Sequence, residues 1–155
     1  MSVPRLIVVG LGLIGGSIAA AARKRLPGVT VRAVDPDEAA LAFAREAALI
    51  DHGATPEGAL AQGWFAPGAA DLVVLATPVA VTAEWLGTLA AEGYEGIVTD
   101  ACSTKRAVVS AARSAGGRYR FVGGHPMAGS ERSGVSAADA ALLDGAYYIL
   151  TPDPT

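Results

Sequence analysis

Three glycines near the amino terminus restrict the possible folds of this chain more than any other feature. In "VVGLGLIGGS", Gly10, Gly12 and Gly15 follow an apolar run and open an alanine-rich segment. In the spacing G-x-G-x-x-G, the first glycine permits a tight turn, the second lets backbone approach a pyrophosphate, and the third lets a helix pack closely on a strand. The free N–H groups at the start of such a helix bind phosphates. The pattern therefore predicts a strand, a turn and a helix that bind a dinucleotide.

An acidic residue in register strengthens this prediction, because the glycines alone would also suit an ordinary turn between a strand and a helix. Asp35 ends the second expected strand, about 20 residues after Gly15. Its carboxylate can accept hydrogen bonds from both hydroxyls of an adenosine ribose and would repel a 2′-phosphate, which favours NAD over NADP. Arg32 is an opposing signal, since an arginine near this position can accommodate that phosphate.

Short apolar runs alternate with alanine-rich segments along the chain. The expected strands are 5–10, 30–35, 71–78, 96–100, 118–126 and 146–152, and the expected helices are 14–26, 37–49 (with Asp37 as N-cap), 81–92, 103–115 and 136–144. This order predicts an α/β fold of the Rossmann type, a doubly wound and mainly parallel sheet with helices on both faces. A looser glycine-rich stretch covers 51–70. Residues 1–150 would form one dinucleotide-binding domain, and "TPDPT" at 151–155 has the composition of a linker.

The composition excludes several classes of function. Hydrophobic residues make up 52% of the 155 residues, which is enough for one core, and the formal net charge of −3 argues against a nucleic-acid-binding protein. A single cysteine cannot form an internal disulfide, which points to a reducing compartment. The apolar opening is too short and too glycine-rich to span a bilayer. We therefore expect a cytoplasmic protein that binds neither nucleic acid nor membrane.

The least generic residues follow three of the expected strands. They are "ATPV" with Thr77, "TDACSTK" with Ser103, and "GGHPMAGSE" with His125. Because ligands of open α/β sheets bind at the carboxyl ends of the strands, we expect these stretches beside the reactive ring of the cofactor. A lone histidine is more often a structural or surface residue, and we expect His52 to be such a residue, in a loop and without a partner. Ser103 could serve merely as a helix N-cap. Lys105 would lie in the first helical turn with its charge in solvent.

Together, "GLGLIGGS", "ATPV", "TDACSTK" and "GGHPMAGSE" resemble the cofactor-binding half of the prephenate dehydrogenase family, which includes arogenate-using relatives. The resemblance extends from Leu6 to about Leu150. It implies NAD-dependent oxidative decarboxylation of prephenate to 4-hydroxyphenylpyruvate, on the route to tyrosine, without a metal. It also implies that His125 takes the proton of the substrate's ring hydroxyl and that Ser103 orients the imidazole through a hydrogen bond. The resemblance assigns cofactor contacts to Gly10, Gly12, Leu13, Ile14, Gly15, Asp35, Ala76, Thr77, Pro78 and Ser103, and substrate contacts to Ser103, His125, Ser130 and Glu131.

Members of this family have a second, largely helical domain, which we expect to be absent from this sequence. It carries most of the homodimer interface and an arginine that binds the substrate carboxylates. Arg132 and Lys105 are the basic residues close to the inferred site, and neither is expected to replace that arginine. The chain could instead be an NAD-binding module without turnover, an arogenate dehydrogenase, or another NAD-dependent enzyme such as a β-hydroxyacid dehydrogenase. A Cys102–His125 nucleophile and a Ser103–His125 hydrolase both lack supporting motifs.

Overall fold

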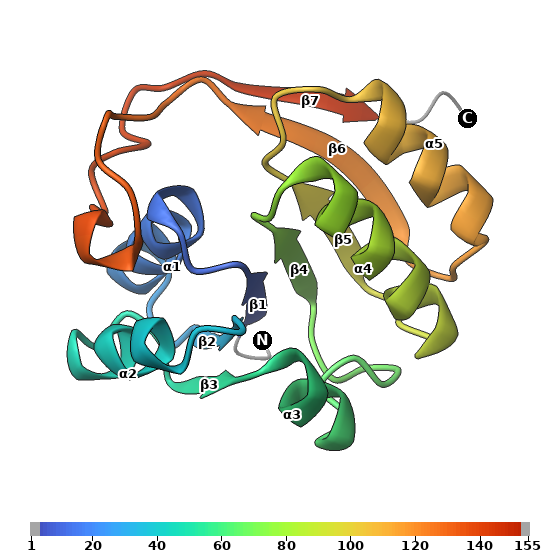
Figure 1. Ribbon diagram of the computed structural model, residues 1–155, viewed down its shortest axis with the longest axis horizontal. Coiled ribbons are helices and arrows are strands. Elements are labelled where there is room, and N and C mark those ends of the chain that lie inside the picture. Colours follow the sequence, from blue (N-terminus) through green and yellow to red (C-terminus); the bar gives the residue numbers. More distant parts are fainter. Residues whose placement is uncertain (1–3, 153–155) are drawn as a thin grey trace.

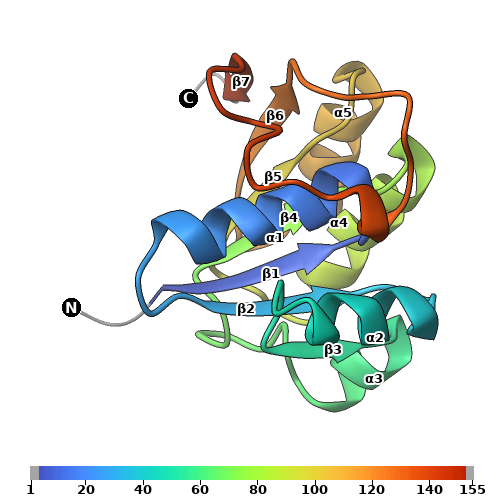
Figure 2. The ribbon, with the colours of Figure 1, turned by 90° about the vertical axis from the view of Figure 1, so that its left-hand side faces the viewer.

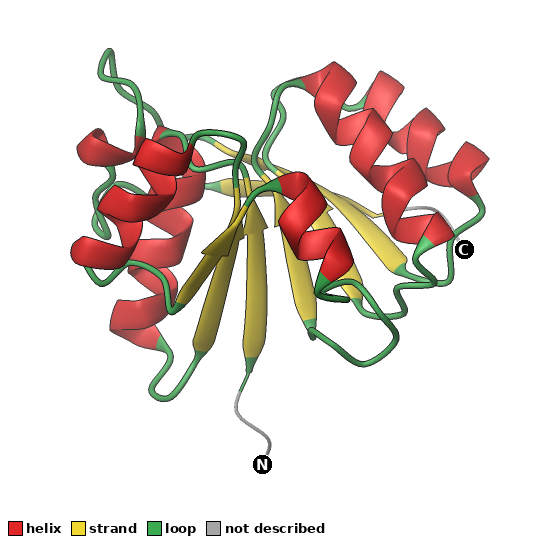
Figure 3. Ribbon diagram, turned by 60° about the horizontal axis from the view of Figure 1, so that its bottom comes forward, coloured by secondary structure: helices red, strands yellow, loops and turns green. Residues whose placement is uncertain are grey.

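A computed structural model describes residues 4–152, which form a seven-stranded sheet with helices on both sides (Figures 1 and 3). The spatial order of the strands is β3-β2-β1-β4-β5-β6-β7. All neighbours are parallel except β6 and β7, which are antiparallel. The strands are β1 (Arg5–Val9), β2 (Thr30–Val34), β3 (His52–Ala54), β4 (Leu72–Leu75), β5 (Ile97–Asp100), β6 (Arg120–Pro126) and β7 (Tyr148–Pro152). This order confirms the expected Rossmann-type, doubly wound fold.

Within residues 4–152, five α-helices connect the strands, and α1 and α2 show sequence signals typical of helix ends. The helices are α1 (Leu13–Arg25), α2 (Glu38–Glu46), α3 (Pro56–Ala61), α4 (Val79–Ala91) and α5 (Arg106–Ala115). Asp37 is the N-cap of α2, as predicted, and its carboxylate accepts a hydrogen bond from the Ala39 N–H at 2.9 Å. Arg23, Lys24 and Arg25 occupy the last turn of α1, where the helix dipole favours cations.

The sheet separates two hydrophobic clusters, because successive side chains of a strand point to opposite faces. Ile7 and Val9 of β1 belong to the cluster under α4 and α5, whereas Val8 belongs to the cluster under α1 and α2. The first cluster also contains the tilted ring pair Phe65 and Trp85, whose centroids are 5.3 Å apart. Both faces of the central strands are therefore buried, which explains why these strands are almost entirely apolar in sequence.

Two segments differ from the sequence-based expectation. The stretch 51–70 contains β3 and α3, so His52 lies in a strand at the edge of the sheet rather than in a loop. The helix expected at 136–144 is replaced by a short 3-10 helix, η1 (Val135–Ala137), followed by turns. Figure 2 shows this segment running alongside α1. Its conformation is set by tertiary contacts, because Val135 is buried in the segment that packs against α1 and α2, and the buried Ser17 hydroxyl accepts the Asp139 N–H at 3.0 Å.

Smaller differences concern the ends of elements. Helix α5 begins at Arg106 with Lys105 as its N-cap. Ser103 therefore lies before the N-cap position and does not cap the helix. Strand β7 continues through Pro152 into the expected linker, and the rest of that linker, 153–155, lies outside the described residues. Among the helices described here, none has both the length and the apolar character needed to cross a membrane.

Candidate functional site

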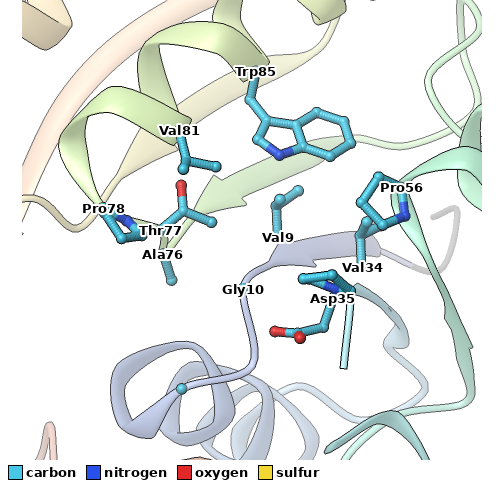
Figure 4. Close-up of a pocket in the computed structure, with 12 residues that line it drawn as sticks. Val9, Gly10, Val34, Asp35, Pro56, Ala76, Thr77, Pro78, Val81 and Trp85 are labelled. Atoms are coloured by element: carbon cyan, nitrogen blue, oxygen red, sulfur yellow. The ribbon is translucent and has the colours of Figure 1, made fainter. Parts of the chain in front are cut away.

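A cavity of about 380 Å³ opens at the carboxyl ends of β1, β2 and β4 (Figure 4). It lies where the strand order reverses between β1 and β4, which is the position where open α/β sheets bind their ligands. Its size falls within the range of small-molecule sites. Figure 4 shows Trp85 and Val81 of α4 on one side of the cavity and Asp35 with the glycine turn on the other. The lining consists of Val9, Gly10, Gly12, Val34, Asp35, Pro36, Pro56, Ala76, Thr77, Pro78, Val81 and Trp85.

Gly10 and Gly15 have the structural roles that the spacing of the glycines predicts. Gly10 has a φ of 93°, and a Cβ there would lie 2.5 Å from the main-chain oxygen of Ala76. A Cβ on Gly15 would lie 1.8 Å from the carbonyl oxygen of Gly10, so only glycine allows α1 to pack this closely on the turn. A Cβ on Gly12 would meet nothing within 4 Å. Gly10 and Gly15 are thus required by the fold, whereas Gly12 leaves open space in front of α1.

The amino end of α1 suits an anionic ligand. Gly12 is its N-cap, and among the described residues no side chain caps this helix and no acidic residue occupies its first turn. The N–H groups of Leu13 and Ile14 have no acceptor within the helix, because the first turn of any α-helix lacks them. Partial positive charge and open space therefore coincide at Gly12, and the residues fit the pyrophosphate of a dinucleotide.

Asp35 joins the end of β2 to the glycine turn. Its Oδ2 accepts the Leu11 N–H at 2.7 Å, and its Oδ1 accepts the Asp37 N–H at 2.8 Å. Each carboxylate oxygen can accept a further hydrogen bond, so the side chain retains acceptor capacity toward the cavity that it lines. Arg32, the opposing signal in the sequence, lies over the ring of Trp64 at 5.3 Å from its centroid, which is a cation–π contact. The guanidinium of Arg32 therefore already has a partner within the protein.

The turn after β4 is held by a small polar network. The hydroxyls of Thr77 and Thr82 are 2.8 Å apart, and Thr82 Oγ1 also donates to the Thr77 main-chain oxygen at 3.0 Å. Cys102 is buried beside these groups, with its Sγ 3.4 Å from Thr82 Oγ1. Burial raises the pKa of the Cys102 thiol, so it is protonated at neutral pH and unsuited to nucleophilic chemistry. This agrees with the rejection of a Cys102–His125 nucleophile.

Asp100 and Lys105 form a buried ion pair that sequence reasoning missed. Asp100 ends β5 with no exposed surface, and its Oδ2 is paired with Lys105 Nζ. The expectation that Lys105 directs its charge into solvent is wrong, since its side chain is only 18% exposed. The same carboxylate accepts the N–H groups of Cys102 and Gly124, each at 3.0 Å. Only the lysine's spacing of five residues from Asp100 hinted at this pair.

His125 lies in β6, two strands from β4 and therefore roughly 10 Å across the sheet from the edge of the cavity. Among the described residues, its Nδ1 is buried without a hydrogen-bond partner. Ser103 is exposed between β5 and α5, and the hydrogen bond expected between Ser103 and His125 is not present in this structure. His125 and Ser103 lie near the carboxyl ends of the strands, as the cavity does, but neither residue lines the cavity.

The other residues expected on the substrate side lie in the exposed segment after β6. Ser130 Oγ accepts the Arg132 N–H at 3.1 Å, so this hydroxyl stabilises its own turn. Glu131 is exposed in the same segment, and neither residue is among those that line the cavity.

The glycines before His125 leave room for side chains of the protein itself. A Cβ on Gly123 would lie 3.2 Å from Lys105 Cδ. A Cβ on Gly124 would lie 2.5 Å from the Tyr148 ring and 2.7 Å from the Asp100 main-chain oxygen. Sequence reasoning also missed Val81 and Trp85 as lining residues, although their spacing of four residues indicates one helix face. No signal in the sequence pointed to Pro56.

Comparison with known proteins gives a consistent result. The family model described as the prephenate dehydrogenase nucleotide-binding domain matches residues 18–155 of this chain. The chain is 45% identical over 152 residues to the prephenate dehydrogenase of Bacillus subtilis (strain 168), covering 95% of this chain and 39% of that protein. The prephenate dehydrogenase of A. aeolicus, solved with hydroxyphenyl propionate and NAD+, superposes with a TM-score of 0.85 at 32% identity, covering 99% of this chain and 52% of that one. Synechocystis arogenate dehydrogenase gives a TM-score of 0.81 at 32% identity, over 96% of this chain and 50% of the other. The chain thus spans about half the length of these proteins or less.

Proposed function

The chain belongs to the family of prephenate dehydrogenase nucleotide-binding domains, and from this membership we propose that it is the NAD-binding half of an NAD-dependent prephenate dehydrogenase. Such an enzyme converts prephenate and NAD into 4-hydroxyphenylpyruvate, carbon dioxide and NADH, a step of tyrosine biosynthesis. The observation that carries the proposal is the cavity bounded by the glycine turn, Asp35 and the end of β4.

We propose the following contacts for the cofactor. The N–H groups of Leu13 and Ile14, beside Gly12, bind the pyrophosphate, and Asp35 accepts hydrogen bonds from the adenosine ribose. The apolar surface of Pro56, Val81 and Trp85 packs on the adenine base. Ala76, Thr77, Pro78 and Ser103 follow β4 and β5 in the direction of His125. When bound, NAD supplies the acceptor for the hydride that leaves the substrate.

His125 is the proposed general base. Its imidazole takes the proton of the ring hydroxyl of prephenate while the adjacent C–H bond breaks, and it returns this proton to the phenolate formed when carbon dioxide departs. The neutral imidazole accepts the first proton, and the imidazolium that results donates the proton in the second transfer. The buried Nδ1 without a partner supports this role, because a buried polar atom that lacks a hydrogen bond is unfavourable unless a ligand completes it. We propose that Ser103, Ser130 and Glu131 complete the substrate side of the site.

A second candidate function is an NAD-binding module that has no turnover by itself. One observation favours it: Lys105, one of the two basic residues inferred near the site, is committed to the buried Asp100. Prephenate carries two carboxylates, which need cations for binding. Of the two basic residues, Arg132 is then the one that could bind a substrate carboxylate, and it lies on the exposed segment after β6. We propose that a segment beyond this chain, a helical domain following residues 1–150, supplies the missing cation and the homodimer interface of the complete enzyme.

The proposal is tested by titrating the chain with NAD and with NADP and then adding prephenate or arogenate while the absorbance of NADH is followed. Tight binding of NAD, with weaker binding of NADP, is the expected result. Production of NADH with prephenate or with arogenate would identify the substrate. Binding without NADH production would support the module without turnover. A chain that binds neither nucleotide would contradict both functions.

A further inference from the structure

Asp100 is a charged side chain with no exposed surface, which makes it unusual among the described residues. Burying a carboxylate is strongly unfavourable unless it is paired and hydrogen-bonded. Its compensation comes from three donors, namely Lys105 Nζ and the main-chain N–H groups of Cys102 and Gly124. A sequence that only needed to end β5 could use a small neutral residue here. The charge therefore requires an explanation in terms of what its donors hold in place.

The two main-chain donors immediately precede the residues proposed for the chemistry. Cys102 precedes Ser103, and Gly124 precedes His125. Oδ2 accepts the N–H of Cys102 in the segment between β5 and α5, and Oδ1 accepts the N–H of Gly124 in β6, each at 3.0 Å. One planar carboxylate thus connects β6 with the segment that follows β5, at points one residue before His125 and Ser103. Because each peptide unit is rigid, this contact restricts where both side chains can lie.

The surroundings of Asp100 show that this connection is closely packed. Because Gly123 and Gly124 have no side chains, the side chains of Lys105 and Tyr148 can pack against them. The Tyr148 hydroxyl also donates a hydrogen bond to the Asp100 main-chain oxygen at 3.0 Å. Gly124 lies in β6 and Tyr148 lies in β7. Both donate a hydrogen bond to Asp100 of β5, so contacts from two neighbouring strands converge on Asp100.

We propose that Asp100 is a positioning residue whose carboxylate, paired with Lys105, sets the placement of Ser103 and His125 relative to each other. The role rests on the proposed function, because it concerns the residues assigned to substrate chemistry. Asp100 does not line the nucleotide cavity, and it acts through the backbone of its two donors.

The main test is the variant Asp100→Asn, which keeps the shape of the side chain. Its amide can accept with only one oxygen, so either Gly124 or Cys102 loses its acceptor and faces an NH2 group instead. The ¹⁵N signals of the histidine side chains then provide a direct readout, because His52 and His125 are the only histidines. We expect the His125 imidazole signals to shift or broaden in this variant and those of His52, at the opposite edge of the sheet, to stay unchanged.

Asp51→Asn is the matched control. Asp51 also accepts a main-chain N–H, from Val31 at 2.8 Å, and also pairs with an arginine, Arg23 at 2.7 Å. It precedes His52, so this substitution should change the His52 signals and leave those of His125 as in the parent chain. If both carboxylate variants altered His125 equally, general loosening of the fold would explain the result and the positioning role would be refuted.

Two further measurements complete the test. Asp100→Asn should leave NAD affinity within about 2-fold, and in any form that turns over it should lower kcat by roughly 10- to 100-fold, as small misplacements of reacting groups do. If Asp100→Asn fails to fold, the variant Lys105→Gln tests the proposal instead. It retains the two hydrogen bonds from the main-chain N–H groups to Asp100 and removes only the cation. We expect it to shift the His125 signals by less than Asp100→Asn would. Unchanged His125 signals in the variant that folds would overturn the inference. Failure of the parent chain to bind NAD would instead contradict the proposed function, and the histidine signals would still report on the positioning.

Discussion

At the scale of single residues, Asp35 has both a structural role and a proposed role in binding the cofactor. Its carboxylate accepts the Leu11 N–H within the glycine turn and the Asp37 N–H at the start of α2, so it fixes the turn to the end of β2. Its remaining acceptor capacity faces the cavity where we propose the ribose. The residue that would recognise the cofactor therefore also shapes the turn that would bind the cofactor's phosphates.

Asp35→Ala should weaken NAD binding by about 10- to 100-fold, the loss expected for charge-assisted hydrogen bonds, and it should reduce discrimination against NADP. Dissociation constants for both nucleotides measure the effect. Asp37→Ala is the control, because it removes the same charge two residues away. It should cost about 1 kcal/mol of stability through loss of the α2 cap while preserving the preference for NAD. An unchanged preference in Asp35→Ala would show that the ribose binds elsewhere.

His125→Ala should leave NAD affinity nearly unchanged and lower turnover by roughly 100- to 10,000-fold in any version of the protein that carries the complete substrate site. The physical reason is that His125 lies outside the lining of the cavity while being proposed as the base. Equilibrium binding and initial rates separate the two effects. His52→Ala, in β3 at the other edge of the sheet, should alter neither quantity. A large loss of NAD affinity in His125→Ala would count against the assignment.

At the scale of elements, the glycine turn shows that one motif contains glycines with different physical requirements. Gly15 is needed because α1 packs against the Gly10 carbonyl, and Gly12 is needed only if a ligand occupies the space before the helix. The sequence spacing alone predicted both roles, since it encodes a local geometry that is common to such turns.

The variants Gly12→Ala and Gly15→Ala should therefore separate ligand binding from folding. Gly12→Ala adds a methyl group to open space and should preserve the thermal midpoint while weakening NAD binding. Gly15→Ala introduces a contact at 1.8 Å and should lower the free energy of unfolding by at least about 1–3 kcal/mol. Thermal unfolding and nucleotide titration of both variants provide the measurements. Equal loss of stability in the two variants would contradict this division of roles.

Regular, strongly patterned elements could be predicted from the sequence, whereas elements fixed by distant contacts could not. The buried parallel strands are continuous apolar runs, so β1, β4 and β5 were placed within a few residues of their observed bounds. The segment 136–144 has helical composition, but the contacts of Val135 and Asp139 with the rest of the fold determine its conformation. The Asp100–Lys105 pair was missed for the same reason, because its geometry depends on β6 and Tyr148.

The start of the sheet offers a pH-dependent prediction. Arg5 in β1 donates side-chain and main-chain hydrogen bonds to Asp71, which precedes β4, and these bonds lower the pKa of the Asp71 carboxyl. A carboxyl whose pKa is lower in the folded state stabilises the fold above its unfolded pKa of about 3.9 and loses this contribution as the pH falls through the folded value. Urea unfolding should thus show a deficit for Asp71→Asn at pH 7 that closes below about pH 4. A deficit that is independent of pH would contradict the assignment.

At the scale of the whole molecule, the two edges of the sheet differ in character. The edge at β3 is a short strand, whereas β7 is a longer antiparallel edge strand with large exposed apolar side chains. Ile149 is 51% exposed, Leu150 is 60% exposed, and the preceding Tyr147 is 83% exposed. An apolar edge of this kind is a favourable surface for association, because both its side chains and its unpaired backbone groups can be buried.

We therefore expect the 155-residue chain, studied by itself, to associate with itself as its concentration rises. Sedimentation velocity over a range of concentrations measures this. The double variant Ile149→Thr with Leu150→Thr should shift the equilibrium toward monomer, because threonine retains the preference for a strand while removing apolar surface. Ile97→Thr is the control, since Ile97 is also exposed but lies at the amino end of a central strand, away from β7. If the double variant associated as strongly as the parent chain, the contact would have to involve another surface. If only the double variant became monomeric, β7 would be identified as the edge through which the chain associates.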